Sequence, residues 1–292
     1  MDGADSLPLR DRARASRRAR ATTADHPRVG RALRAVALLA GLFFGLPVIV
    51  LVLRALLDGS LAEAAGATTV LVALRLSLVT TAVSLGITVA IGLPLAFVFA
   101  RRRFRGVALL EVVVSLPIVL PPSVAGLALL LVFGRNGLLG EPLRVLGLQI
   151  PFTVIAVVLA QVFVSAPFFI RSAKAGFAAV DLDLEDAARV DGASDRQLFR
   201  AITIPLASGS LAAGLVMSWA RSLGEFGATI MFAGNIEGRT QTLPLVVYGE
   251  FQAGDLGASV AAAVILVLAA VGVLLAVRAL HWGRVLDLRG IG

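Results

Sequence analysis

Apolar segments of about 20 residues, separated by shorter polar ones, recur along the chain. A helix of that length crosses a hydrocarbon core of ~30 Å, whereas membrane-spanning strands would be shorter and would alternate in polarity. We therefore predict an all-α integral membrane protein with six transmembrane helices. The six predicted spans are residues 35–53, 77–100, 109–133, 152–170, 206–223 and 258–280.

The third span contains three prolines, Pro117, Pro121 and Pro122, within the stretch LPIVLPPSVAG (residues 116–126). Proline lacks the backbone N–H that a helix needs, but membrane helices tolerate it where neighbouring groups satisfy the freed carbonyls. We expect a bent helix here. Bent helices often line pathways through a membrane protein.

The distribution of basic residues predicts the orientation of the chain. Of its 27 lysines and arginines, 21 lie at its two ends and in segments 101–105 and 171–200, which six spans place on one side. Cytoplasmic segments carry such an excess, so we predict that both termini are cytoplasmic (N-in/C-in). The same bias accounts for the net charge of +8, and we expect no nucleic-acid partner.

This orientation divides the chain into three parts. Residues 1–34 are predicted to form a disordered basic cytoplasmic tail, because they are rich in arginine and lack apolar periodicity. Residues 35–281 form the six-helix domain, with a cytoplasmic loop at about 171–205. Residues 282–292 form a short cytoplasmic tail.

Candidate chemistry is sparse. The chain has no cysteine and only two histidines, His26 and His281, far apart in the sequence, so we expect no disulfide and no metal site. An intramembrane enzyme would need a metal-ligand cluster or a nucleophile beside a base, and the sequence offers neither. We predict that the chain is not an enzyme.

The cytoplasmic loop contains an organised polar stretch, EDAARVDGASDRQLFRAITIP (residues 185–205). Asp181 or Asp183 can cap a first short helix, and Gly192 is suited to end it in the left-handed conformation. Ser194 and Gln197 have the spacing of a capping box at the start of a second helix.

The second helix should present Leu198, Phe199 and Ile202 on one face, and Pro205 should end it, because proline disfavours a helical residue before it. Patterning alone is compatible with a loop that rests on lipid headgroups and with one that docks on a partner.

The spacing of Asp186-Ala187-Ala188, Gly192, Ile202 and Pro205 resembles the EAA signature of ABC-transporter permeases. Asp186 replaces the family's glutamate, although Glu185 is adjacent, and Ile204 replaces a frequent leucine. The resemblance implies the type I importer permease fold, with this loop as a coupling helix that docks in a cleft of a separate ATPase. The implied coupling residues are Glu185, Asp186, Ala187, Ala188, Gly192, Ala193, Phe199, Ile202 and Pro205.

The chain itself lacks the phosphate-binding pattern G-x-x-x-x-G-K-[ST], since its one lysine, Lys174, lies in RSAKAG. We therefore expect ATP hydrolysis on another polypeptide. The resemblance implies that ATP and Mg²⁺ bind to that partner ATPase and that this chain carries no cofactor.

Glu225 is one of very few acidic residues near membrane depth, and such carboxylates are functional candidates by default. It could form part of a gate, since Gly224 and Gly227 flank it and suit a moving joint. The alternative is that it pairs with Arg221, one helical turn earlier, and only steadies a helix end.

The stretches GEFGA, AGNI and RTQTLPL, between residues 224 and 245, resemble molybdate permeases, as does LPIVLPPSVAGLALLLVFGRNGLLG (residues 116–140). The similarity covers about residues 77–275. Sulfate and tungstate permeases belong to the same oxyanion branch, so both stay as alternatives. Candidate path or gate residues are Arg221, Ser222, Gly224, Glu225, Gly227, Thr229 and Asn235, with Thr240 and Thr242 as further hydrogen-bond donors.

The resemblance also implies an assembly in the bacterial inner membrane. Two copies of this chain would form a homodimer that binds two ATPase subunits and a periplasmic or lipid-anchored oxyanion-binding protein. A secondary transporter driven by an ion gradient is the alternative from another class. Such transporters often contain internal repeats, and we see none in this sequence.

Overall fold

The computed structural model describes residues 31–102 and 104–287, with side chains from 33 to 275. The chain separates into two compact units, residues 1–52 and 53–292. Within the first unit, the described part is the beginning of helix α2 (Arg31–Leu57). Residues 1–30 of the predicted tail (1–34) lie outside the described residues. Residues 31–34 belong to α2.

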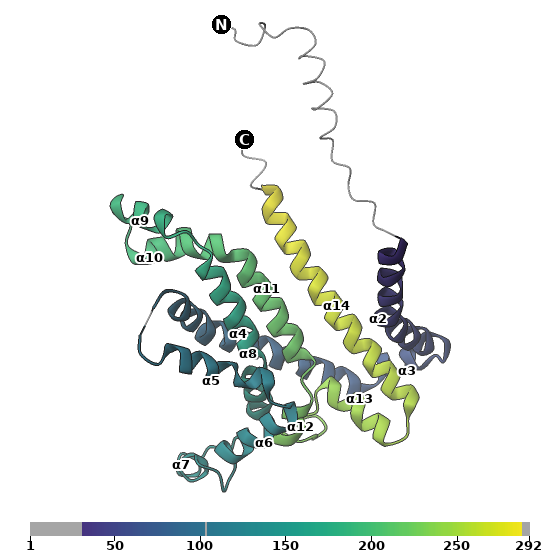
Figure 1. The fold of residues 1–292 in the computed structure, drawn as a ribbon. Helices are drawn as coiled ribbons and strands as arrows, with labels where there is room; N and C mark the ends of the chain where they lie inside the picture. The colour runs from purple at the N-terminus through teal and green to yellow at the C-terminus, as the bar shows by residue number, and fades with distance from the viewer. Residues whose placement is uncertain (1–30, 103, 288–292) are drawn as a thin grey trace, which may run out of the picture. The chain divides into compact units, whose positions relative to one another are not determined.

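Helices joined by turns and irregular loops are the regular secondary structure in the described part of the second unit (Figure 1). Its elements are α3 (Ser60–Gly66), α4 (Thr68–Arg101), α5 (Val107–Val119), α6 (Pro122–Phe133), α7 (Gly140–Val145), α8 (Val154–Ala178), α9 (Leu182–Val190), α10 (Asp195–Leu198), the π-helical turn η1 (Phe199–Thr203), α11 (Ile204–Leu223), α12 (Gly227–Phe232), α13 (Leu243–Gln252) and α14 (Leu256–Asp287). Helix α14 therefore continues past residue 281, where the sequence predicted that the helical domain ends.

Five helical stretches of the described chain are long and apolar enough to cross a membrane: Leu33–Leu57, Thr68–Arg101, Val154–Ala178, Asp195–Leu223 and Leu256–Leu275. The pair α5 and α6 provides a sixth crossing if the two helices count as one broken span. Counted in this way, the described chain has the six spans of the predicted all-helical fold, and the prediction is confirmed.

The predicted bend in the third span is a sharp break. The direction of the helix changes by 119° between α5 and α6. Leu120 precedes Pro121, and Pro121 precedes Pro122, so both residues are driven out of the helical region; their ψ angles are 133° and 136°. Pro122 then starts α6, because the first helical position does not need an N–H.

Helices α4, α8 and α11 form the packed centre of the second unit. Their contacts use small residues, which let helix backbones approach closely where the apolar lipid gives no hydrophobic drive for association. A Cβ atom at Gly176 would lie 2.6 Å from Ser210 Cβ, and one at Gly214 would lie 2.9 Å from Ser172 Cβ. The backbones of α8 and α11 therefore approach each other closely at two glycines, one on each helix.

Buried hydroxyls add polar contacts between the same helices. Ser77, Thr80, Thr81, Ser84 and Thr88 follow one face of α4, and all five are fully buried. The hydroxyls of Ser84 and Ser222 lie 3.2 Å apart, which links α4 to α11. The polar face of α4 is therefore an interior packing surface of the chain.

We expect Gly176→Leu to lower the stability of the helix bundle by about 2 kcal/mol, because the added side chain has no room between α8 and α11. Thermal unfolding in detergent would measure this effect. Gly209→Leu on α11 is the matched control, since a Cβ there meets nothing within 4 Å. Equal transition temperatures for the two variants would contradict the close packing.

Candidate functional site

The first candidate site is the segment from Asp181 to Pro205, which connects the end of α8 to the first residues of α11 (Figure 1). The Asp181 carboxylate caps α9 by accepting a hydrogen bond from the Asp183 backbone N–H at 3.0 Å. Gly192 ends the helix with φ of 87°, and the N–H groups of Gly192 and Ala193 donate to the carbonyls of Arg189 and Ala188. This is a Schellman motif, and it confirms the predicted left-handed end of the helix.

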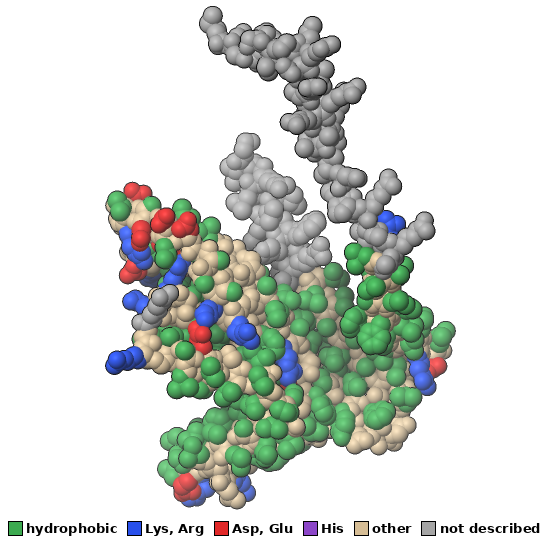
Figure 2. Space-filling model, in the orientation of Figure 1, with side chains coloured by type: hydrophobic (Ala, Val, Ile, Leu, Met, Phe, Trp, Pro, Cys, Tyr) green, Lys and Arg blue, Asp and Glu red, His purple; other side chains and the backbone are tan. Residues whose placement is uncertain are grey.

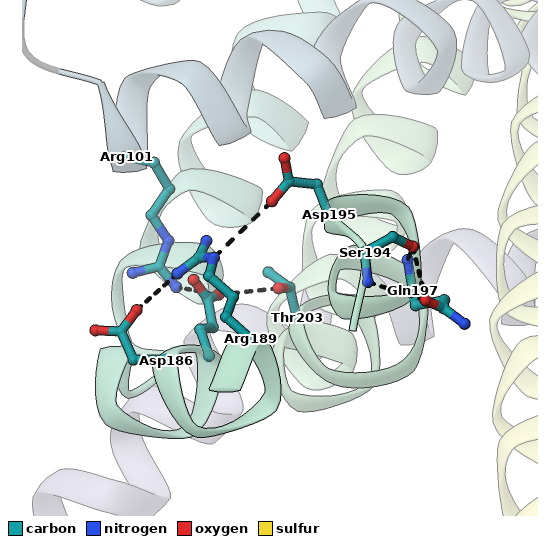
Figure 3. Close-up of polar contacts among 8 residues, drawn as sticks. Arg101, Asp186, Arg189, Ser194, Asp195, Gln197 and Thr203 are labelled. Carbon is teal, nitrogen blue, oxygen red and sulfur yellow. Dashed lines mark hydrogen bonds and ion pairs between the residues drawn. The ribbon is translucent and has the colours of Figure 1, made fainter. Parts of the chain in front are cut away.

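The predicted capping box at the next helix start is also present. The Gln197 side chain accepts from the Ser194 N–H at 2.9 Å, and the Ser194 hydroxyl accepts from the Gln197 N–H at 3.4 Å (Figure 3). At both helix starts, a backbone N–H group that lacks a partner within the helix therefore donates to a side chain of the segment itself.

The predicted helix end at Pro205 is wrong. The backbone remains helical from Asp195 to Leu223, because η1 widens one turn: the Ile204 N–H donates to the Phe199 carbonyl, five residues earlier. Proline in a regular helix clashes with the carbonyl four residues before it, and the wider turn accommodates the ring. The second short helix is thus continuous with the membrane-spanning helix α11.

Glu185 attaches α9 to two other elements. Its residue is only 2% exposed. Its Oε1 accepts hydrogen bonds from Nη2 of Arg101, at the end of α4, at 2.7 Å, and from the Thr203 hydroxyl, in η1, at 2.9 Å (Figure 3). The same Arg101 atom also donates to the Val180 carbonyl at 3.3 Å. One carboxylate therefore joins α4, α9 and the π-helical turn.

Asp186, the neighbouring acid, is in the opposite environment. Its side chain is 70% exposed and accepts from Arg189 at 2.7 Å, one turn along α9. Arg189 also lies 3.9 Å from Asp195, so that this basic side chain bridges the two short helices (Figure 3). Acidic and basic side chains gather over α9 and α10, and further basic side chains cross the middle of the visible face, among mostly apolar ones (Figure 2).

Phe199 does not lie on the free surface of the segment. Its ring centroid is 5.0 Å from that of Phe97 and 6.0 Å from that of Phe177, and the ring is partly buried in the core around α4 and α8. The large apolar side chains that the segment exposes are instead Leu182, Leu184 and Val190, all on α9.

The second candidate site is the joint between α11 and α12, around Glu225. The Glu225 side chain is fully buried, and its Oε2 lies 2.6 Å from Nη1 of Arg221, whose side chain is 28% exposed. Its Oε1 accepts from the Ala228 N–H at 2.7 Å, at the start of α12. The ion pair of the simpler interpretation is present, and the carboxylate also holds the two helices together across the break.

This joint lies directly against the break between α5 and α6. A Cβ at Gly227 would lie 2.7 Å from Pro122 Cβ, and a Cβ at Gly126 would lie 2.6 Å from the Ala228 carbonyl oxygen. Two interrupted helices therefore meet backbone to backbone. Only glycine at both positions permits this approach.

The predicted path residues differ in accessibility. Ser222, Glu225, Thr229, Thr240 and Thr242 are buried within the chain. Ser222 contacts Ser84, and Thr240 accepts from the Ile236 N–H at 3.1 Å, so both hydroxyls serve local structure. Gly224 and Asn235 are exposed, and Arg221 and Gly227 are partly exposed, which leaves these four able to contact a solute.

Sequence reasoning missed two residues of the first site. The sequence indicates Arg101 only as a basic residue that bears on orientation, and it contains no signal for Thr203. Arg101 lies 84 positions before Glu185, so no local spacing signals their contact. A buried acid such as Glu185 requires a partner, but the sequence does not show which of many arginines supplies it.

We expect Glu185→Ala to loosen the segment by about 3 kcal/mol, because it leaves Arg101 without its buried partner. Amide hydrogen exchange across residues 181–203 would measure the loosening. Asp186→Ala is the matched control, and its effect should stay within about 0.5 kcal/mol because its ion pair is exposed. Equal protection in the two variants would show that Glu185 does not hold the segment.

Comparison with solved structures supports the fold. A crystal structure titled as a bacterial ABC transporter involved in the import of the acidic polysaccharide alginate contains a chain with a TM-score of 0.69 and 16% identity. The match covers 85% of this chain and 93% of that one. At this identity the likeness shows the fold alone, which is that of an ABC importer permease.

Curated relatives are considerably closer in sequence. The molybdenum transport system permease protein ModB of Mycobacterium tuberculosis is 44% identical over 207 residues, which cover 71% of this chain and 78% of that protein. The sulfate transport system permease protein CysW of Synechococcus elongatus is 40% identical over 183 residues, which cover 62% of this chain and 64% of that protein. A family model described as "Binding-protein-dependent transport system inner membrane component" matches residues 89–282. The chain belongs to this family of transport permeases.

Proposed function

We propose that this chain is the membrane-spanning permease subunit of an ATP-driven importer of molybdate. The observation that carries the proposal is the 44% identity to a molybdenum transport permease across 78% of that protein's length. The rigid, capped segment from Asp181 to Pro205 supports it, since a transport subunit powered by a separate ATPase needs a surface through which to receive motion.

The structure suggests how this motion would travel. The exposed face of α9, with Asp186 and Leu184, is available to a partner ATPase. The helix carrying Phe199 continues without interruption into α11, so displacement of the segment would shift α11 along with it. Glu185 would carry the same displacement to α4 through Arg101. Packed elements of this kind move as rigid bodies.

The break between α11 and α12 would then be the moving part of the path. Helix α11 ends at this joint, where Glu225 holds α12. Discontinuous helices form substrate sites in many transporters, because their unpaired backbone groups face the passage. Arg221, Gly224, Gly227 and Asn235 are the residues that we assign to the path.

The remaining components follow from this assignment. Two copies of the chain would pair with two ATPase subunits, which bind ATP and Mg²⁺, and a binding protein would deliver the oxyanion from outside. The complex would reside in the bacterial inner membrane, with α9 and α10 in the cytoplasm. The basic residues concentrated in segments 101–105 and 171–200 support this orientation.

A sulfate permease is the second candidate, favoured by the 40% identity to CysW. Its match covers 64% of that relative, against 78% for the molybdenum permease. Tungstate has the same charge and tetrahedral shape as molybdate, and we expect it to be a competing substrate of the same path.

Uptake into vesicles that contain the complete transporter would test the assignment. We expect accumulation of labelled molybdate that requires ATP, with strong competition by tungstate and weak competition by sulfate. Stronger competition by sulfate than by tungstate would favour the sulfate permease. Uptake driven by an ion gradient without ATP and without the ATPase would overturn the ABC assignment in favour of a secondary transporter.

We expect Gly192→Val to reduce the molybdate transported per ATP hydrolysed by several-fold. A Cβ at this position meets nothing within 4 Å, so the effect arises from the left-handed φ of 87° alone. A β-branched residue resists that conformation by roughly 1–2 kcal/mol, whereas asparagine tolerates it. Gly192→Asn should therefore retain near-normal coupling. Identical coupling ratios in the two variants, at equal membrane levels, would argue against a role for the rigid turn.

A further inference from the structure

A groove between α5 and α8 has no role in the proposed transport path. It has a volume of about 690 Å³ and is open to the surface of the chain. Most of its lining is apolar, including Phe99, Val112, Leu116, Val119 and Ile170. A tetrahedral oxyanion is far smaller than this space and gains nothing from apolar walls, because its binding needs hydrogen-bond donors or cations.

Charged side chains are confined to a small part of the groove. Lys174 Nζ donates to Glu111 Oε1 at 2.6 Å, with side-chain exposures of 37% and 31%. Arg171 lies one helical turn before Lys174 on α8, is exposed, and has no ion pair within the described residues. Two cations face one carboxylate, so this part of the groove carries a net positive charge.

The charged part lies near helix ends. Lys174 is four residues from the end of α8, and Glu111 is four residues from the start of α5, which is about 6 Å along either helix. The predicted orientation puts these ends at the cytoplasmic face. Lipid phosphates lie at that level, and the acyl chains extend from there into the apolar region.

We propose that this groove binds an anionic phospholipid, with its phosphate on Lys174 and Arg171 and an acyl chain along α5. Basic pockets between membrane helices on the cytoplasmic side bind lipid headgroups in this manner. Glu111 competes with the phosphate for Lys174. Glu111 thereby lowers the affinity for the phosphate, whereas the net positive charge that remains favours anionic lipids over zwitterionic ones.

Native mass spectrometry of the detergent-purified full chain would test the site, with palmitoyl-oleoyl phosphatidylglycerol and phosphatidylcholine as probes. We expect preferential retention of phosphatidylglycerol, and loss of that preference by on the order of tenfold in the double variant Arg171→Gln, Lys174→Gln. The double variant Arg196→Gln, Arg200→Gln removes the same charge elsewhere on the predicted cytoplasmic side and should retain the preference. Equal losses in both would overturn the proposal.

Glu111→Gln provides a test in the opposite direction. By freeing Lys174, it should raise the preference for phosphatidylglycerol roughly fivefold. No rise would count against the proposal even if the double variant proved unstable.

Two other occupants are distinguishable. Sodium molybdate should not displace bound phosphatidylglycerol; displacement would identify the groove as an oxyanion site and overturn the lipid assignment.

The chain has no native cysteine, so Val112→Cys places a single thiol in the groove. Phosphatidylglycerol should slow its labelling by a maleimide. Rapid disulfide formation between two copies would show that a second copy covers the groove, and would overturn the proposal as well.

Discussion

The architecture of the segment from Asp181 to Pro205 depends on the hydrogen bonds and the ion pair of the buried Glu185 carboxylate. This carboxylate accepts from Arg101 on α4 and from Thr203 in η1, so three elements meet at one oxygen atom. Burying a charge is unfavourable unless it is paired and hydrogen-bonded, and here both conditions hold. The ends of the membrane helices therefore determine the position of α9. The exposed Asp186 lies on this helix, so its position is held as well. The two adjacent acids have separate roles, one internal and one available to a partner.

A second constraint concerns how interrupted helices are accommodated. In the membrane every backbone polar group needs a partner, so breaks survive only where the protein encloses them. The break at Pro121 and Pro122 packs against Gly227, and the carboxylate of Glu225 accepts from the backbone at the start of α12. The π-helical turn before Pro205 solves the related problem differently, by widening rather than breaking the helix. The helix is therefore broken at Pro121 and Pro122, whereas it stays continuous through Pro205.

The sequence predicted much of this structure where the signals are local. Helix caps at Asp181, Gly192 and Ser194 depend on neighbouring residues, and the spans depend on apolar length, so both were predictable. The contacts of Glu185 and Phe199 were not, because Arg101 and Phe97 are distant in the chain and come close only when α4 packs against α8. Pro205 was misjudged for a different reason: the local rule disfavours a helix before proline, but tertiary packing around Thr203 and Ala207, both buried, stabilises a wider turn instead.

The environment of Arg221 bears on how a divalent oxyanion could pass. Most candidate hydroxyls, such as Ser222 and Thr229, are buried in helix contacts, which leaves Arg221 as the one cation among the predicted path residues with an exposed portion. An unpaired arginine would hold a divalent anion firmly, and transport requires that binding be weak enough for release. Glu225, 2.6 Å away, offsets part of that charge while remaining buried itself. If Arg221 lines the path, as we propose, the ion pair and a role in the path are compatible interpretations of Glu225, because pairing with Arg221 would weaken the attraction between that arginine and an anionic solute.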